Sequence, residues 1–112
     1  MVDCVFCKIA EGKVPTKILT ESETVIAFSD IKPSADTHIL IVPKKHIETV
    51  MDIKLADSDL LGEMISVAQE LIREKGLSKK YRLVFNGGSL QVVPHIHLHL
   101  LGGNFKRKNN DK

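Results

Sequence analysis

The spacing of apolar residues in this 112-residue chain predicts one long helix. Between residues 57 and 75 the apolar side chains recur every three or four positions, as they do along one face of an α-helix. Asp57 or Ser58 is suited to cap the start of this helix, and Gly76 is suited to end it. The apolar face consists of Leu60, Leu61, Met64, Ile65, Ala68, Leu71 and Ile72.

A period of two predicts a strand over Thr37–Val42. His38, Leu40 and Val42 fall on one face, and the other face is also apolar, so we expect a sheet covered on both sides and a His38 that is not simply solvated. The order of elements predicts an α+β domain, with an antiparallel sheet, one long helix and a short N-terminal helix. The remaining elements are expected as a helix over Cys4–Ala10 that ends at Gly12, and strands over Lys17–Leu19, Thr24–Ser29, Tyr81–Asn86 and Val92–Leu101.

Length and composition fit one domain, which we place at residues 1–105. Residues 106–112 hold four basic residues and one acidic residue, and we expect a disordered basic tail there. The rest of the chain is close to neutral, which argues against binding to nucleic acid or membranes through bulk charge. No apolar run approaches ~20 residues, no signal peptide is recognisable, and the two cysteines fit a reducing, cytoplasmic location.

Three histidines alternate along the last predicted strand, at His95, His97 and His99. Alternate strand residues point to one face about 6–7 Å apart, and three imidazoles so close cannot all be protonated. A neutral imidazole is a nucleophile, and a protonated neighbour is a general acid. This pairing suits attack on phosphorus, with His97 as the nucleophile and a neighbouring histidine protonating the leaving group. A polar strand face or a structural histidine cluster is the alternative interpretation.

The segment around these histidines, Gln91–Gly103, resembles the signature of the histidine triad (HIT) superfamily. Its trailing Gly102-Gly103 resembles the Hint-like branch of purine nucleoside phosphoramidases. The resemblance extends over Asp3–Ile9, Ala27–Pro33 and Thr37–Ile47. It implies a HIT fold, a homodimer, and hydrolysis of nucleoside 5′-phosphoramidates or acyl-nucleotide adducts through a covalent nucleotidyl-histidine intermediate.

The resemblance also implies roles for single residues. His97 matches the nucleophile, and His99 matches the contact to the α-phosphate. His38, on the neighbouring strand, matches a fourth histidine beside the site, and His95 is the outer histidine of the triad; the implied catalytic set is these four. Asp30 matches the carboxylate that holds the ribose hydroxyls. Turn formation alone is the alternative for Asp30 and Asn86, and core packing is the alternative for Phe6 and Phe28. The nucleotide-binding set implied in this way is Asp30, Ile31, Phe6, Ile9, Phe28, Asn86, Ser89, Gln91, Val92, His97 and His99.

Cys4 and Cys7 form a Cys-x-x-Cys motif, which by itself fits a metal half-site, a redox pair or two packed thiols. Bacterial-type relatives in this superfamily resemble the chain in placing two such cysteines and two histidines around zinc. The matching histidines are His46 and His95. Because a Cys2His2 set fills a tetrahedral zinc, the implied metal is structural and no catalytic metal is required. His95 then becomes an anchor and not a catalyst.

The chain departs from the family pattern in the loop before the triad. Leu90 stands where a glycine is usual, and Val92 where the eukaryotic phosphoramidases have a serine; Ser89 is a possible substitute. The chain also has no tryptophan, so it lacks the Trp-Pro-Pro-like ending of many Hint-branch proteins. The rival functions are a dinucleoside polyphosphate hydrolase, a zinc hydrolase with metal on the triad, and a catalytically weak nucleotide-binding adaptor.

Overall fold

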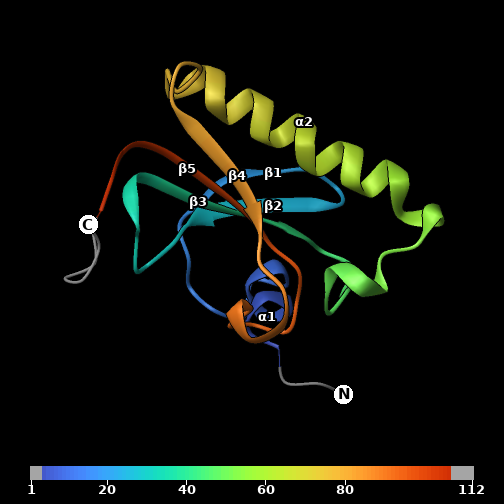
Figure 1. The fold of residues 1–112 in the computed structure, drawn as a ribbon. Helices are drawn as coiled ribbons and strands as arrows, with labels where there is room; N and C mark the ends of the chain where they lie inside the picture. The colour runs from blue at the N-terminus through green and yellow to red at the C-terminus, as the bar shows by residue number, and fades with distance from the viewer. Residues whose placement is uncertain (1–3, 107–112) are drawn as a thin grey trace.

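The computed structural model describes residues 4–106 and places a five-stranded sheet between two helices (Figure 1). The sheet has the order β1-β2-β3-β5-β4, and every neighbouring pair is antiparallel. The strands are β1 (Ile18–Glu21), β2 (Val25–Ser29), β3 (Ala35–Pro43), β4 (Tyr81–Phe85) and β5 (Leu98–Phe105). The helices are α1 (Val5–Ala10) and α2 (Ser58–Glu74), with short 3-10 turns η1 (Val50–Asp52), η2 (Leu55–Asp57) and η3 (Gly88–Leu90). The predicted fold class is confirmed.

The long helix α2 covers one face of the sheet (Figure 1). Alternate residues of β3 and β5, such as Ile39, Ile41 and Leu100, point toward it and are buried. The predicted face of the helix is correct except at its edge. Ile65 is 41% exposed, and Val67 is buried in its place. The buried set 64, 67, 68, 71 and 72 is a narrower stripe than the predicted one.

The helix start also differs from the prediction. Asp57 occupies the N-cap position of α2, but its carboxylate makes no hydrogen bond to the helix. It accepts one from the backbone N–H of Lys54 at 2.9 Å and one from Nζ of Lys45 at 2.7 Å. Asp57 therefore caps the preceding turn η2 and holds the segment that follows β3.

The opposite face of the sheet carries α1 and a second buried cluster. Alternate residues of β2 and β3 that point away from α2, among them Phe28 and Leu40, pack against Phe6 and Ile9 of α1. His38 and His99 lie on this same side of the sheet. His38 and Leu40 alternate along β3 and so share a face, and His99 of β5 is the residue directly opposite Leu40. The alternation predicted for Thr37–Val42 is confirmed, and His38 is only 7% exposed.

The last strand begins six residues later than predicted and ends four residues later. Only His99 of the three triad histidines is in β5, which runs through Gly102 and Gly103. His95 and His97 precede the strand, so the prediction that all three point to one strand face is wrong. Pro94 has no backbone N–H that could donate a hydrogen bond to a neighbouring strand. The N–H of Ile96 donates to the carbonyl of Ile47 at 2.7 Å, outside the sheet.

The outer limits of the domain stay a prediction. The expected basic tail over 106–112 lies outside the described residues except for Lys106. Within residues 4–106, no helix combines the length and apolar character needed to cross a membrane.

Candidate active site

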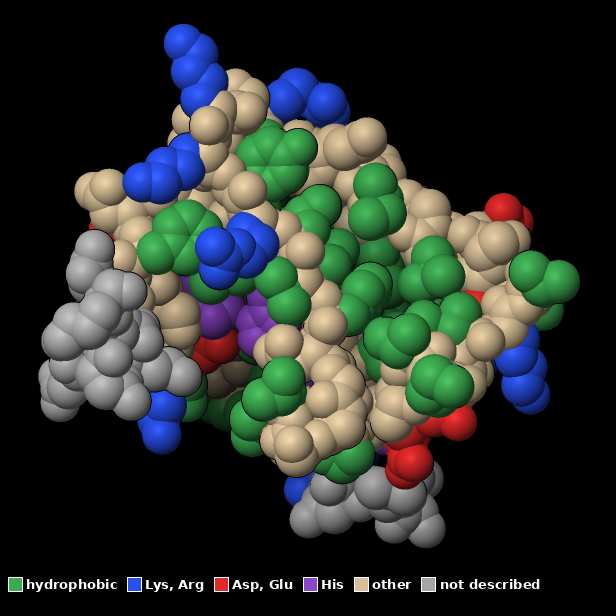
Figure 2. Space-filling view, in the orientation of Figure 1, with side chains coloured by type: hydrophobic (Ala, Val, Ile, Leu, Met, Phe, Trp, Pro, Cys, Tyr) green, Lys and Arg blue, Asp and Glu red, His purple; other side chains and the backbone are tan. Residues whose placement is uncertain are grey.

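A pocket of about 490 Å³ opens on the α1 side of the sheet, with His97 and His99 in its wall. Figure 2 shows histidine side chains in a hollow, with an acidic side chain beside them. The lining brings together nine predicted nucleotide-binding residues and His38, whereas Ser89 and Gln91 of the predicted set are not in it. The lining comprises Val5, Phe6, Ile9, Thr16, Phe28, Ser29, Asp30, Ile31, Lys32, Ser34, His38, Leu40, Asn86, Leu90, Val92, Val93, His97 and His99.

His97 offers a nucleophilic nitrogen to this pocket. Its Nδ1 lies 2.9 Å from the backbone carbonyl of His95. Because a carbonyl only accepts, Nδ1 must carry the proton, and Nε2 is left with a free lone pair. The ring is 7% exposed, and the edge-to-face ring of Phe6 packs against it with centroids 5.0 Å apart. These contacts fix the tautomer and the orientation of the imidazole.

His38 and His99 form a hydrogen-bonded pair across β3 and β5. The backbone N–H of Ser34 donates to Nδ1 of His38 at 2.9 Å, so the proton of neutral His38 is on Nε2. That Nε2–H donates to Nδ1 of His99 at 2.8 Å. Neutral His99 therefore carries its proton on Nε2. A single backbone amide thus sets the tautomers of both rings.

The pair resists protonation. Burial, the positive charge that His97 would carry, and His38 together lower the pKa of His99 to about 4. Burial is also the largest cause that lowers the pKa of His38, although Asp30 opposes it. The geometry gives a further reason. A proton added to Nδ1 of His99 would face the Nε2–H of His38 across the 2.8 Å contact, so two hydrogens would point at each other. Both imidazoles are neutral at neutral pH, which argues against the predicted general acid among them.

Asp30 and Asn86 flank this pair. One carboxylate oxygen of Asp30 accepts the backbone N–H of Lys32 at 2.8 Å. The other oxygen is 3.5 Å from Nε2 of His38 and faces the pocket lining. Nδ2 of Asn86 lies 3.4 Å from Nε2 of His99. Both of these nitrogens carry hydrogens in this tautomer, so the contact places Asn86 beside the pair without a hydrogen bond between them.

The loop between β4 and the triad is tied down by Gln91. Its side-chain amide donates to the carbonyls of Glu48 and Val93, the latter at 3.0 Å. Gln91 therefore braces the loop, and its nucleotide-binding role stays a prediction, as does that of Ser89. The neighbouring side chains Leu90 and Val92 line the pocket and are 71% and 88% exposed.

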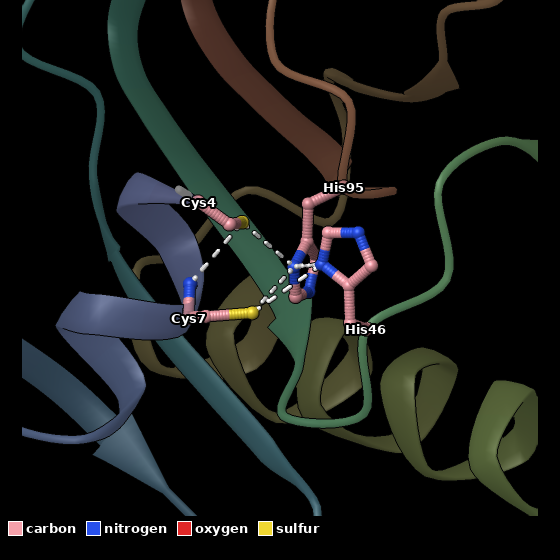
Figure 3. A group of neighbouring side chains, drawn as sticks. All are labelled: Cys4, Cys7, His46 and His95. Atoms are coloured by element: carbon pink, nitrogen blue, oxygen red, sulfur yellow. Dashed lines mark hydrogen bonds between the residues drawn. The ribbon is translucent and has the colours of Figure 1, made fainter. Parts of the chain in front are cut away.

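Four potential metal ligands converge beside the pocket (Figure 3). Cys4 and Cys7 come from the start of α1, His46 from the segment after β3, and His95 from the segment before β5. Nδ1 of His95 is 3.3 Å from Sγ of Cys4 and 3.5 Å from Sγ of Cys7. Nδ1 of His46 is 3.3 Å from Sγ of Cys7 and 3.1 Å from Nδ1 of His95. This group could hold a metal ion.

The carbonyl of Pro43 prepares His95 for this position. It accepts the Nε2–H of His95 at 2.7 Å, which leaves the lone pair of Nδ1 facing the two sulfurs. Burial lowers the pKa of His95, which keeps the ring neutral. The contributions of Pro43 and Ser34 were missed in the sequence because both act through backbone atoms, which carry no sequence signal.

Known proteins resemble this chain over most of its length. A family model described as "Scavenger mRNA decapping enzyme C-term binding" matches residues 3–112. A purine nucleoside phosphoramidase of Escherichia coli K12 is 42% identical over 106 residues, covering 90% of this chain and 87% of the relative. A bifunctional adenosine 5′-phosphosulfate phosphorylase/adenylylsulfatase of Arabidopsis thaliana is 41% identical over 98 residues, covering 86% of this chain and 67% of the relative.

A solved structure agrees closely with the fold. The crystal structure of a HIT family hydrolase from Legionella pneumophila Philadelphia 1 has a TM-score of 0.89 and 47% sequence identity. The match covers 98% of this chain and 100% of that chain. The likeness therefore includes both faces of the sheet and the segments that carry the pocket.

Proposed function

Because this chain belongs to the histidine triad superfamily, we propose that it hydrolyses nucleoside 5′-phosphoramidates or acyl-nucleotide adducts through a nucleotidyl-His97 intermediate. The observation that carries the proposal is the hydrogen bond from Nδ1 of His97 to the carbonyl of His95, since it leaves a lone pair on Nε2 in the pocket. The neutral His38–His99 pair beside it supports an enzyme over a passive nucleotide-binding adaptor.

The pocket lining offers groups suited to each part of a nucleoside monophosphate. Phe6, Ile9 and Phe28 give an apolar slot for the base, and the exposed Ile31 lies at its mouth. The free oxygen of Asp30 is suited to accept from the ribose hydroxyls. The phosphate then lies between His97 and His99, where Asn86 is a further donor.

The chemistry proceeds in two displacements at phosphorus. Nε2 of His97 forms a bond to phosphorus while the P–N bond to the leaving amine breaks, and the amine takes a proton from water. A water molecule then attacks phosphorus, the bond to His97 breaks, and the lone pair returns to Nε2. The proton of that water passes to solvent, and the nucleoside monophosphate leaves.

His99 acts in this scheme as a hydrogen-bond donor and not as an acid. Its Nε2–H is suited to donate to a phosphoryl oxygen as negative charge builds there, and its low pKa keeps it from changing protonation state. Donors positioned in this way contribute about 10²–10³ in kcat. This proposed role differs from the expectation that a protonated neighbour serves the leaving group.

A side-by-side assay tests the proposed reaction. We expect the chain to hydrolyse adenosine 5′-phosphoramidate and to prefer it over diadenosine triphosphate, with activity that resists a chelator. The variant His97→Ala should lose at least about 10³-fold in kcat. Wild-type turnover by His97→Ala would refute the proposed nucleophile, and activity lost at once on chelation of folded protein would favour metal on the triad.

We also propose that Cys4, Cys7, His46 and His95 bind a structural zinc ion. Zinc bound tetrahedrally to nitrogen and sulfur would separate two nitrogens by about 3.4 Å and a nitrogen from a sulfur by about 3.6 Å. The corresponding separations of 3.1 Å and 3.3–3.5 Å fit this geometry. Zinc would supply a cross-link between α1 and the segment that holds His97. All four ligands belong to the protein, so no position is open for catalysis.

Metal analysis and unfolding test the zinc site. Untagged protein should contain one zinc per chain, and a chelator should lower Tm while kcat of the protein that remains folded changes little. The variant Cys7→Ser should bind less zinc and melt at a lower temperature. A metal-free preparation with an unchanged Tm would refute the site.

We further propose a homodimer in the cytoplasm. β4 is an edge strand whose outer backbone groups are unpaired within the sheet, and Tyr81 of β4 and Ile65 of α2 are 48% and 41% exposed. Figure 2 shows hydrophobic side chains gathered over the middle of this face. A second copy that pairs with this edge would cover them. The two free thiols fit a reducing compartment.

A further inference from the structure

Exposed apolar side chains concentrate at the mouth of the pocket. Among the described residues, nine large hydrophobic side chains are exposed, and four of them line this one pocket. They are Val5, Ile31, Leu90 and Val92. Large exposed apolar groups gathered at a cleft mark a binding surface more often than isolated ones do. Ile31 lies beside the proposed base slot and Val5 belongs to α1, so Leu90 and Val92 are the two exposed apolar side chains that the loop before His97 brings to the mouth.

The loop that carries Leu90 and Val92 connects Asn86 to the segment that holds His97. It leaves β4 at Asn86, whose amide is beside His99, and it ends at the segment that leads into His97. Gln91 lies between Leu90 and Val92 in the sequence, and its side-chain amide donates hydrogen bonds to the carbonyls of Glu48 and Val93. The η3 turn, closed by a bond from the N–H of Leu90 to the carbonyl of Gly87 at 3.2 Å, shortens the loop further. The loop is thus braced, with both side chains at the pocket.

The direction of attack places the leaving group at this mouth. The attacking and leaving atoms of a phosphoryl transfer are roughly in line through phosphorus. His97 is buried at 7% exposure, so its Nε2 attacks from inside the pocket. The group that departs must therefore point outward, toward the exposed rim.

The charges of the pocket do not favour a cationic leaving group. Asp30 is the one carboxylate in the lining, and it is already bonded to the N–H of Lys32 and faces His38. The only other charged lining residue is Lys32 itself. A leaving group with an ammonium side chain would find no partner on the loop, whereas an alkyl or aryl chain would cover Leu90 and Val92.

We propose that Leu90 and Val92 form an apolar leaving-group subsite, which makes nucleotides with an alkyl or aryl amine or a fatty acyl group on phosphorus the preferred substrates. The inference rests on the proposed hydrolysis and adds the substrate class. The reaction itself is unchanged: the P–N or P–O bond to the apolar group breaks as the His97–P bond forms. An amine leaves with a proton from water, and an acyl group leaves as a carboxylate.

A homologous series of substrates tests the subsite. Adenosine 5′-phosphoramidates of methylamine, butylamine and hexylamine have leaving groups of similar basicity and differ in apolar length. Full burial of a methylene favours binding about fourfold, and contact on one side of a rim gives about twofold. We therefore expect kcat/KM of the wild-type protein to rise about twofold to fourfold for each methylene until the chain extends past the rim.

Matched variants locate the effect. The double variant Leu90→Asn, Val92→Thr keeps the side-chain size but makes the rim polar, and it should flatten the rise with chain length. The control Leu55→Asn changes a side chain that is 95% exposed and is not in the pocket lining, and it should keep the wild-type slope. The slope within each protein is compared, so differences in overall rate cancel.

Three outcomes would overturn the proposal. A flat series in an active wild-type protein refutes the apolar subsite and leaves the proposed hydrolysis intact. An unchanged slope in the double variant refutes the role of Leu90 and Val92. A change in sedimenting mass in the double variant shows that a second copy covers the rim. Absence of turnover for every substrate would instead refute the proposed hydrolysis itself.

Discussion

The amide N–H of Ser34 donates to Nδ1 of His38, and through that contact it determines where the protons of both His38 and His99 lie. The carbonyl of His95 does the same for His97. Two backbone groups thus give the site one free nitrogen lone pair and one N–H that is available to a phosphate. The residue types of the site were predictable from the sequence, but their tautomers were not, because the atoms that set them belong to the backbone.

Asp30 provides a prediction about the ribose. The variant Asp30→Asn should weaken binding of adenosine monophosphate by about 10- to 100-fold, because hydrogen bonds to a charged acceptor contribute about 1.5–3 kcal/mol. Removing both ribose hydroxyls from the ligand should weaken binding to the wild type by a similar factor. When the variant binds the ligand without ribose hydroxyls, the two losses of binding free energy should not add. Calorimetry of the wild type and Asp30→Asn, each with adenosine monophosphate and with the ligand that lacks the hydroxyls, checks this. Additive losses would mean that Asp30 and the hydroxyls do not interact.

The His38–His99 pair predicts a stability that depends on acid pH. A histidine in the unfolded chain takes up a proton near pH 6.5, whereas His99, which His38, His97 and Asp30 face, does so near pH 4 in the fold. Between these values the unfolded chain binds more protons, so the free energy of unfolding falls as the pH falls from about 6.5 to 4. Above pH 6.5, His99 is neutral in both the folded and the unfolded chain, so it adds no pH dependence to the free energy of unfolding.

Urea unfolding at several pH values measures this dependence. The variant His99→Asn removes the titrating group and should show a shallower fall of unfolding free energy between pH 6.5 and 4 than the wild type. Parallel curves for the two proteins would mean that the pKa of His99 is not depressed in the fold.

At the scale of elements, periodicity located the helices and strands better than it located their ends. The long helix is within one residue of its predicted limits at both ends, because a 19-residue pattern averages over local exceptions such as Ile65. The last strand was misplaced because its alternating pattern begins in a segment that does not pair with the sheet. In that segment the N–H of Ile96 bonds to the carbonyl of Ile47, and His95 contacts Cys4 and Cys7. Tertiary contacts decide such boundaries, and a period of two does not reveal them.

Two glycines give a matched test of the packing between elements. A Cβ added to Gly102 in β5 would lie 2.7 Å from both Cδ atoms of Leu77, whereas one added to Gly62 in α2 has no atom within 4 Å. We expect Gly102→Ala to destabilise the protein by about 1–3 kcal/mol, because Leu77 is buried and must move. Gly62→Ala should stabilise it by about 0.5–1 kcal/mol through helix propensity.

Denaturant unfolding of the two glycine variants separates the effects. Equal free energies of unfolding for Gly102→Ala and the wild type would show that the loop at Leu77 adjusts without cost. A destabilised Gly62→Ala would show that the outer face of α2 is covered in the native assembly.

At the scale of the whole molecule, the proposed dimer extends the sheet across β4. Sedimentation of the wild type should give twice the chain mass. Ile65→Glu places a charge at the proposed interface and should give the single-chain mass, whereas Val92→Glu at the pocket mouth should not change the mass. A wild type that sediments as a single chain at micromolar concentration would contradict the proposal.

The whole account depends on whether His97 attacks phosphorus, and the stereochemistry of the reaction tests this most directly. A single diastereomer of adenosine 5′-thiophosphoramidate is hydrolysed in water labelled with ¹⁸O, and the configuration of the product is determined. Attack by His97 followed by water inverts phosphorus twice, so the account predicts net retention. Net inversion would mean that water attacks the substrate directly, and it would contradict the nucleotidyl-His97 intermediate.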